Sequence, residues 1–366
     1  MLRTTIWISG LGTAMLLCAT PVLAQVDSVR ASTLPGRQVA EKAYNAGLAS
    51  FAARNYAAAL TSFDQALAAK PDFAAAYANR AATRLALKEY PAAVADYDQA
   101  LKLEPSAYAA YFGRAQAREA AGQAPEAEAD YGSALKANPA YAPAWYNRGV
   151  LHFEHGEYQA AYDDFSGAVK ADSANAYAYH DRASASMQLG NYAAAVPDYS
   201  KAFTLQPTLL PALLNRAAAE RRAGQLPAAL RDYDAYLAQK TDNALAFCNR
   251  GTARYDNKDY AGAVADFSRA IALNATYAYA WNNRAAAELK LEQYAKANAD
   301  ATEALRLNAS YAEAYLNRGH AREMLRQADE ACQDWRKAAT LGLAVGNRYA
   351  AAAGCAGQAA DESAEK

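Results

Sequence analysis

A spacing of 34 residues recurs along this chain of 366 residues. One position of the repeat is alanine nine times without an insertion, at Ala59, Ala93, Ala127, Ala161, Ala195, Ala229, Ala263, Ala297 and Ala331. Twelve residues before each alanine stands Gly or Ala, and four residues after it stands a large aromatic residue in eight of the nine units. The length alone suggests two or three domains, but a constant period of this size indicates a stack of like supersecondary units.

Each unit has the pattern of two short helices joined by a turn. Apolar and small residues recur at three- and four-residue spacing in both halves. Between the halves stand glycines suited to a left-handed helix end, namely Gly122, Gly156, Gly190 and Gly224. Prolines suited to the first turn of a second helix follow at Pro91, Pro125 and Pro227, and prolines close the units at Pro71, Pro105, Pro139 and Pro207. One such hairpin cannot bury its apolar face alone, so we expect the hairpins to stack into a solenoid.

The fourth unit resembles the tetratricopeptide repeat (TPR) most closely, with Trp145, Gly149, Ala161, Phe165 and Ala168 at signature positions. The resemblance implies an all-α fold, a right-handed α-solenoid of nine gapless 34-residue TPR hairpins with a concave groove. The predicted units are 40–73, 74–107, 108–141, 142–175, 176–209, 210–243, 244–277, 278–311 and 312–345. The resemblance also implies binding of other proteins or peptides.

Both ends of the chain are expected to differ from the repeats. Residues 1–24 combine a basic start, an apolar run and small residues before a cleavage point, which is the pattern of a secretory signal peptide. An uncleaved anchor and a lipoprotein modified at Cys18 are the alternatives. Cleavage places the mature chain in the periplasm or outside the cell, without a membrane span. We expect a flexible linker over 25–39 and a flexible tail over 356–366.

Three cysteines remain after this cleavage. Residues 346–355 are predicted to form a short helix that caps the last hairpin. Cys332 and Cys355 lie at similar distances from the turn near Leu343, so antiparallel helices would bring them face to face. In an oxidising compartment this arrangement predicts a disulfide, with two buried thiols as the alternative. Cys248 is left as a buried thiol or an intermolecular partner.

Arginine and aspartate also follow the repeat. The arginines are Arg80, Arg114, Arg148, Arg182, Arg216, Arg250, Arg284 and Arg318. Sixteen residues after each stands an aspartate, at Asp96, Asp130, Asp164, Asp198, Asp232, Asp266, Asp300 and Asp334. The first unit lacks both members and has Ala46 and Ser62 in their places. Because the hairpin turn lies midway between the two positions, we expect structural ion pairs between helices or neighbouring units; a charged ligand-binding stripe is the alternative.

The resemblance places the ligand-binding surface on the first helix of each unit, mainly at positions 2, 5, 6, 9, 12 and 13. Position 6 is Asn in seven of the nine units, at Asn45, Asn79, Asn147, Asn215, Asn249, Asn283 and Asn317. An amide donates and accepts at once, and such a row resembles the asparagine ladder of some peptide-binding TPR superhelices. A repeated surface residue without this role is the alternative. The predicted groove also includes Tyr44, Leu48, Phe51, Phe112, Tyr146 and Phe153.

Charge and motifs argue against several other functions. The chain balances 37 Lys and Arg against 38 Asp and Glu, so a nucleic-acid partner held by bulk charge is not expected. His152 and His155 share one helix face, but two ligands without a nearby cysteine do not make a metal site. No nucleotide-binding loop or recognisable nucleophile motif is present. We therefore predict no cofactor, no metal and no enzymatic activity. Tyr44 and Leu48 also replace the Lys and Asn with which some TPR domains hold the carboxylate of chaperone tails.

The sequence thus predicts an exported, non-enzymatic scaffold that binds a protein or an extended peptide segment within the cell envelope. The alternative is a structural solenoid that self-associates into a homo-oligomeric spacer. A glycan-binding protein fits the residues less well.

Overall fold

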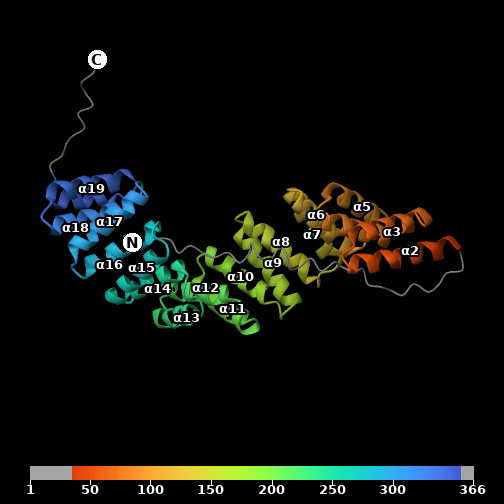
Figure 1. The fold of residues 1–366 in the computed structure, drawn as a ribbon, viewed down its shortest axis with the longest axis horizontal. Coiled ribbons are helices and arrows are strands. Elements are labelled where there is room, and N and C mark those ends of the chain that lie inside the picture. Colours follow the sequence, from red (N-terminus) through yellow and green to blue (C-terminus); the bar gives the residue numbers. More distant parts are fainter. Residues whose placement is uncertain (1–34, 356–366) are drawn as a thin grey trace, which may run out of the picture. The chain divides into compact units, whose positions relative to one another are not determined.

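The computed structural model describes residues 35–355, which form nineteen helices and no strand (Figure 1). This part of the chain divides into two compact parts, which we call the N-terminal part, residues 35–207, and the C-terminal part, residues 208–355. The predicted signal peptide, the linker residues 25–34 and the tail over 356–366 lie outside the described residues.

Five helical hairpins make up the N-terminal part. They are α2 (Pro35–Ala52) with α3 (Tyr56–Ala69), α4 (Ala74–Ala86) with α5 (Tyr90–Leu103), α6 (Tyr108–Ala120) with α7 (Ala124–Ala137), α8 (Ala142–Glu154) with α9 (Tyr158–Ala171), and α10 (Ala176–Gln188) with α11 (Tyr192–Leu205). Within each hairpin the two helices pack against each other, and α3, α5, α7 and α9 each pack against the first helix of the next hairpin.

Four hairpins and a final short helix make up the C-terminal part. They are α12 (Leu210–Arg222) with α13 (Leu226–Gln239), α14 (Ala244–Asp256) with α15 (Tyr260–Leu273), α16 (Ala278–Lys290) with α17 (Tyr294–Leu307), α18 (Ala312–Met324) with α19 (Ala328–Thr340), and then α20 (Val345–Ala352). Every first helix after α2 begins at the first residue of a predicted unit, at positions 74, 108, 142, 176, 210, 244, 278 and 312. Consecutive hairpins of about 34 residues confirm the predicted α-solenoid.

The turn inside each hairpin uses the same left-handed residue at position 15 of the unit. Gly122, Gly156, Gly190 and Gly224 have φ between 77° and 80° there. In the other five units the same position is Arg54, Lys88, Lys258, Glu292 or Arg326, with φ between 58° and 66°. The backbone hydrogen bonds are alike in both groups; for example, Asn55 N donates to Ser50 O and Gln123 N donates to Arg118 O, both at 2.8 Å. Glycine in the sequence therefore predicts only four of the nine turns, because five other turns reach the same conformation with another residue.

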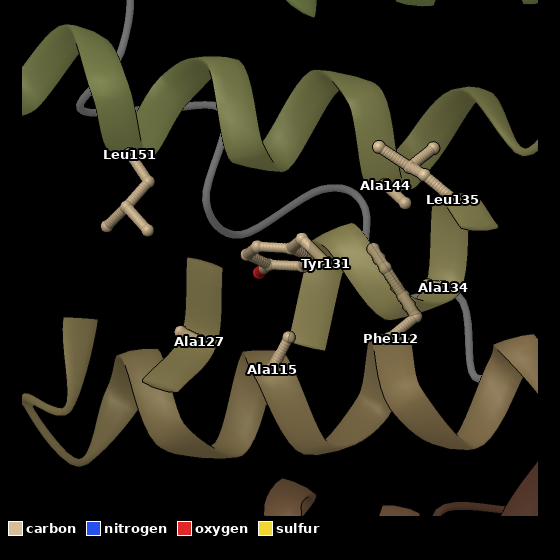
Figure 2. Close-up of a cluster of buried hydrophobic side chains, with 8 residues drawn as sticks. All are labelled: Phe112, Ala115, Ala127, Tyr131, Ala134, Leu135, Ala144 and Leu151. Atoms are coloured by element: carbon tan, nitrogen blue, oxygen red, sulfur yellow. The ribbon is translucent and has the colours of Figure 1, made fainter. Parts of the chain in front are cut away.

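The hydrophobic core runs from one hairpin into the next. In the cluster of Figure 2, Tyr131 from α7 lies between Phe112 of α6 and Leu151 of α8, and alanines fill the narrow spaces beside these side chains. The ring at Tyr131 is completely buried, and its hydroxyl donates a hydrogen bond to Glu119 Oε2 at 2.6 Å. Because α8 belongs to the following unit, no hairpin in this region completes its core alone.

A small residue at position 8 of the first helix faces an aromatic ring at position 24 of the second. The units with glycine at position 8 pair it with Phe or Trp, as Gly47–Phe63, Gly149–Phe165, Gly251–Phe267 and Gly319–Trp335. The units with alanine pair it with Tyr, as Ala81–Tyr97, Ala115–Tyr131, Ala183–Tyr199 and Ala217–Tyr233, or with another alanine, as Ala285–Ala301. A Cβ atom added to Gly149 would lie 2.9 Å from the Phe165 ring, which is closer than packed carbon atoms allow.

Replacing Gly149 by Ala should destabilise the protein by about 1–3 kcal/mol, because the added methyl group must displace the Phe165 ring in a closely packed core. Gly132→Ala is the matched control: its Cβ would lie 3.5 Å from the nearest atom, and alanine favours the helix. Urea unfolding followed by circular dichroism measures both. A Gly149→Ala variant as stable as Gly132→Ala would contradict the close approach.

The first helix begins earlier than expected. The predicted flexible linker extended to residue 39, but α2 begins at Pro35, so the linker prediction is wrong for residues 35–39. Pro35 suits the first position of a helix, Arg37 Nε lies 3.3 Å from Glu41 Oε1 one turn along, and Ala40 is completely buried. These contacts support an additional turn before the repeat begins.

The last helix is held against the last hairpin by apolar packing and a disulfide. Helix α20 places Ala350 against Trp335 and Ala331 in a small buried cluster. The helix ends at Ala352, three residues before the predicted end of the cap, and Cys355 follows it. Cys332 of α19 and Cys355 form a disulfide with their Cα atoms 5.7 Å apart. Cys248 is a buried free thiol.

Candidate functional site

The first helices of successive hairpins lie side by side. In the N-terminal part α2 contacts α4, α4 contacts α6 and α8 contacts α10; in the C-terminal part α12 contacts α14, α14 contacts α16 and α16 contacts α18. No two successive second helices in residues 35–355 contact each other to the same extent. Each part therefore curves toward its first helices. We call the side chains at positions 2, 5, 6, 9, 12 and 13 of the units the first-helix face.

The asparagine row lies on this face, but much of it is buried. Asn79, Asn215, Asn249 and Asn283 expose only 5%, 4%, 8% and 1% of their surface. Asn45 is exposed, and Asn147 and Asn317 are half-buried. The expectation of seven amides open to a ligand is therefore wrong for four of them. The reason is their position between two first helices, where the neighbouring hairpin covers them.

The row instead joins position 6 of one unit to position 5 of the unit before it. Asn79 Nδ2 donates to Tyr44 Oη at 3.0 Å, and Asn317 Nδ2 donates to Asn282 Oδ1 at 2.8 Å. In the fifth unit aspartate replaces asparagine, and Tyr146 Oη donates to Asp181 Oδ2 at 2.7 Å in place of the amide bond. These bonds cross from hairpin to hairpin at a separation of 35 residues. They stabilise the stack, because each satisfies polar atoms that burial takes from water.

The predicted aromatic residues of the groove divide into two groups. Phe112 and Tyr146 are buried, with 3% and 6% of their surface exposed, and belong to the core clusters of their hairpins. Their assignment to a ligand-binding groove is therefore corrected. Tyr44, Phe51 and Phe153 keep half-buried rings on the first-helix face. Leu48 and Leu85 are also half-buried apolar side chains of the first-helix face.

All eight arginine–aspartate pairs form between the two helices of their hairpin. In each pair the Arg Nε and Nη2 atoms donate to both carboxylate oxygens of the Asp at 2.5–2.9 Å. The guanidinium of Arg80 also lies 5.4 Å from the centre of the Tyr77 ring, and its Nη1 reaches Asp64 of the preceding unit at 2.6 Å. The hydrogen bond to Asp96 raises the pKa of Arg80, so its charge is permanent. These contacts fit the prediction of structural ion pairs, since the arginine and the aspartate of each pair are bonded to each other within the chain.

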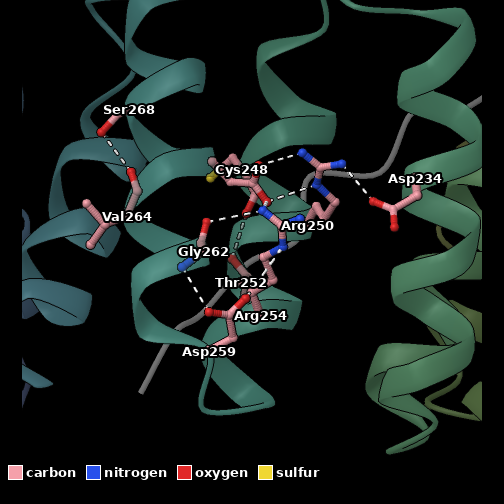
Figure 3. A network of polar contacts seen from close by, with 10 residues as sticks. Asp234, Cys248, Arg250, Thr252, Arg254, Asp259, Gly262, Val264 and Ser268 are labelled. Atoms are coloured by element: carbon pink, nitrogen blue, oxygen red, sulfur yellow. Dashed lines mark hydrogen bonds and ion pairs between the residues drawn. The ribbon is translucent and has the colours of Figure 1, made fainter. Parts of the chain in front are cut away.

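A third residue completes several of these pairs. Position 11 of the unit is a donor to the same aspartate in five units, at Arg84, Arg118, His152, Arg254 and Arg322, with distances of 2.7–2.9 Å. Figure 3 shows the seventh unit, where Arg250 reaches back to Asp234 and Arg254 approaches the same network from the next turn of α14. The sequence pattern found the first arginine and the aspartate but not this third member, because its residue type varies.

His152 takes part in an ion-pair network. Its Nδ1 lies 2.9 Å from Asp164 Oδ2, and its Nε2 lies 3.4 Å from Glu128 Oε1. His155 is exposed at the end of the same helix. In residues 35–355 no group of three or more His, Cys, Asp or Glu side chains is arranged to hold a metal ion.

The sequence model of the tetratricopeptide repeat family matches residues 44–107, 83–131, 112–176, 214–278 and 248–297, and a second model of the same repeat matches residues 176–209. The matches cover more than half of the chain, and the protein therefore belongs to the tetratricopeptide repeat family. TPR solenoids are protein–protein interaction scaffolds and are typically not enzymes. No curated protein matches the chain.

Solved structures of TPR proteins share the fold. A TPR protein from Parabacteroides merdae is 20% identical over 67% of this chain and 98% of its own, with a TM-score of 0.54. The C-terminal part of a TPR protein from Cytophaga hutchinsonii is 18% identical over 66% of this chain and 98% of its own, with a TM-score of 0.56. A chain of the Cut9–Hcn1 hetero-tetramer of the APC/C is 16% identical over 77% of this chain and 56% of its own, with a TM-score of 0.52. At these identities the similarity concerns the fold. No helix within residues 35–355 has both the length and the apolar character needed to cross a bilayer.

Replacing Asp164 by Ala should destabilise the protein by about 3 kcal/mol, because it leaves Arg148 and His152 without their buried carboxylate. Asp163→Ala removes the adjacent, exposed carboxylate and should change the stability by less than about 0.5 kcal/mol. Urea unfolding of both variants tests this difference. Equal losses would show that burial of the pair has no energetic role.

Proposed function

We propose that the protein is a non-enzymatic scaffold of the cell envelope that binds a protein or an extended peptide segment along its first-helix face. The observation that carries this proposal is a set of half-buried side chains on that face in the N-terminal part, namely Tyr44, Leu48 and Phe51 on α2 and Phe153 on α8. Side chains of this kind provide apolar contact area for a partner. Because the family consists of interaction scaffolds, this surface is the natural place for the partner.

Polar groups beside these side chains suit an extended backbone. Asn45 is exposed and Asn147 is half-buried, so both amides have surface available to a partner. Amides can bond to the backbone N–H and C=O groups of a peptide whatever its sequence. Apolar pockets would then select its side chains, which is the division of roles found in other peptide-recognition sites.

The proposed location in the envelope rests on two independent features. Residues 1–24 have the pattern of a secretory signal peptide. The disulfide between Cys332 and Cys355 belongs to a class of bond that persists in oxidising compartments and is rare in the cytosol. The two features come from opposite ends of the chain and support the same compartment.

Mass spectrometry of the protein recovered from its native host should give a mature N-terminus at Gln25, because the small residues before it suit a signal peptidase. Recovery in the periplasmic or external fraction is expected as well. An intact Met1 in a cytosolic fraction would contradict export.

A photo-crosslinking residue at position 45 of α2 should capture a partner in cell envelopes, whereas the same residue at position 65 of α3 should not. Asn45 and Gln65 are both exposed, but only Asn45 lies on the first-helix face. The captured segment, made as a synthetic peptide, is then titrated against the protein by fluorescence anisotropy.

In that titration the Asn45→Ala/Asn147→Ala variant should bind about tenfold more weakly, because two hydrogen bonds of about 0.5–1.5 kcal/mol each are lost. Its helicity should equal that of the unchanged protein. Capture from position 65 alone, or unchanged binding by the double variant, would contradict the proposed surface.

A further inference from the structure

Position 11 carries a carboxyl group in two units, whereas the first and fifth units have Ser50 and Ser186 there. Where five units place Arg or His beside the paired aspartate, the sixth unit has Glu220 and the eighth has Glu288. A cationic donor is thus replaced by a carboxyl group at the same place in the hairpin. Both residues lie in the C-terminal part, on α12 and α16.

Each of these glutamates is buried against the aspartate of its own hairpin. Glu220 exposes 7% of its surface and lies beside Asp232 of α13. Glu288 exposes 4% and lies beside Asp300 of α17. Two ionised carboxylates can only accept hydrogen bonds, so a hydrogen bond between the two groups of either pair requires a proton.

The aspartate of each pair already forms an ion pair with the arginine of its own hairpin. Arg216 Nε lies 2.5 Å from Asp232 Oδ2, and Arg284 Nε lies 2.5 Å from Asp300 Oδ2. The negative charge therefore belongs on the aspartate, and the proton belongs on the glutamate. The Oε2 atoms of Glu220 and Glu288 are both buried and have no hydrogen-bond partner, so no hydrogen bond at these atoms stabilises a second negative charge.

Charges around Glu220 both raise and lower its pKa. Glu220 faces Asp232 and Arg231 from α13 and Arg216 from its own helix, with the buried Tyr233 hydroxyl nearby. Burial, together with Asp232, outweighs the two arginines and raises the pKa of Glu220 to about 7.

The eighth unit repeats this balance of charges. Glu288 faces Asp300 and Lys296 from α17 and Arg284 from its own helix. Burial and Asp300 raise the pKa of Glu288 to about 7 against the two cations. The same departure from the repeat thus has the same electrostatic consequence in two separate hairpins.

We propose that the two carboxyl pairs make the hairpins α12–α13 and α16–α17 proton-dependent sections of the scaffold. With the proton in place, each glutamate donates to its aspartate and the two helices are joined. Without it, two like charges meet in a buried site and the hairpin opens more readily. The hairpins α14–α15 and α18–α19 have Arg254 and Arg322 at this position and lack this response.

The direction of the effect follows from proton linkage. The unfolded glutamates titrate near 4.5 and the folded ones near 7, so the folded state holds extra protons between these values. The contribution of these two glutamates to stability is therefore greatest below about pH 4.5, falls as the pH rises toward 7, and levels off above it.

Hydrogen exchange of the full-length protein, measured by mass spectrometry and corrected for the intrinsic pH dependence of exchange, tests the proposal. Between pH 5.5 and pH 7.5 the protection of peptides from α12–α13 and α16–α17 should fall about tenfold. Peptides from α14–α15, which contains no histidine, are the internal control and should change much less. An equal change in all three hairpins, or no change in any, would overturn the proposal.

The variant Glu220→Gln/Glu288→Gln should lose this pH response, because an amide donates to the aspartate without titrating. Glu323→Gln, at an exposed position of α18, is the matched control and should keep the response. A response that persists in the double variant would overturn the proposal. If the double variant does not fold, the contrast of α12–α13 and α16–α17 with α14–α15 in the unchanged protein decides the question.

Discussion

The close approach of a small residue to an aromatic ring determines the distance between the two helices of almost every hairpin. Gly149 leaves no room for a methyl group beside Phe165, and Gly251 meets Phe267 in the same way. The rings are completely buried, and each contributes more apolar surface than the alanines around it. A chain so rich in alanine depends on these rings for its core. In the eighth unit, where Ala301 replaces the ring, only alanines and Leu289 form the cluster.

The buried ion pairs depend on the same stacking. Arg114 joins Asp130 within its hairpin and reaches Asp98 of the hairpin before it, so one guanidinium contacts two units. Burying such charges is unfavourable unless every donor has an acceptor, and the preceding hairpin supplies one of them. Within residues 35–355 no hairpin precedes the first unit, and this unit has Ala46 and Ser62 in place of the pair. The absence of both residues there is consistent with an interaction that needs a neighbour.

Stacking also decides which polar groups remain available to a partner. The amide of Asn79 donates to Tyr44 and that of Asn283 to Cys248, both on the preceding first helix, so the two amides are enclosed between hairpins. The surface left for recognition consists of side chains such as Leu48 and Phe51, together with the less enclosed amides of Asn45 and Asn147. In the C-terminal part, the proposed proton dependence of α12–α13 and α16–α17 rests on the carboxyl groups of Glu220 and Glu288. The scaffold is thus uniform in its backbone and varied in its side-chain chemistry.

The amino-acid sequence was enough to predict the period, the first residue of eight of the nine first helices and the residues of the ion pairs, because the same packing problem recurs every 34 residues and selects the same residue types. It also predicted the two cysteines that meet, from their spacing about the last turn. The fold was needed to show that Phe112 and Tyr146 belong to the core, that asparagines bond between hairpins and that Glu220 and Glu288 lie beside aspartates. Burial depends on how closely one hairpin covers the next, and that distance is set by packing between units rather than by the residues of any single unit.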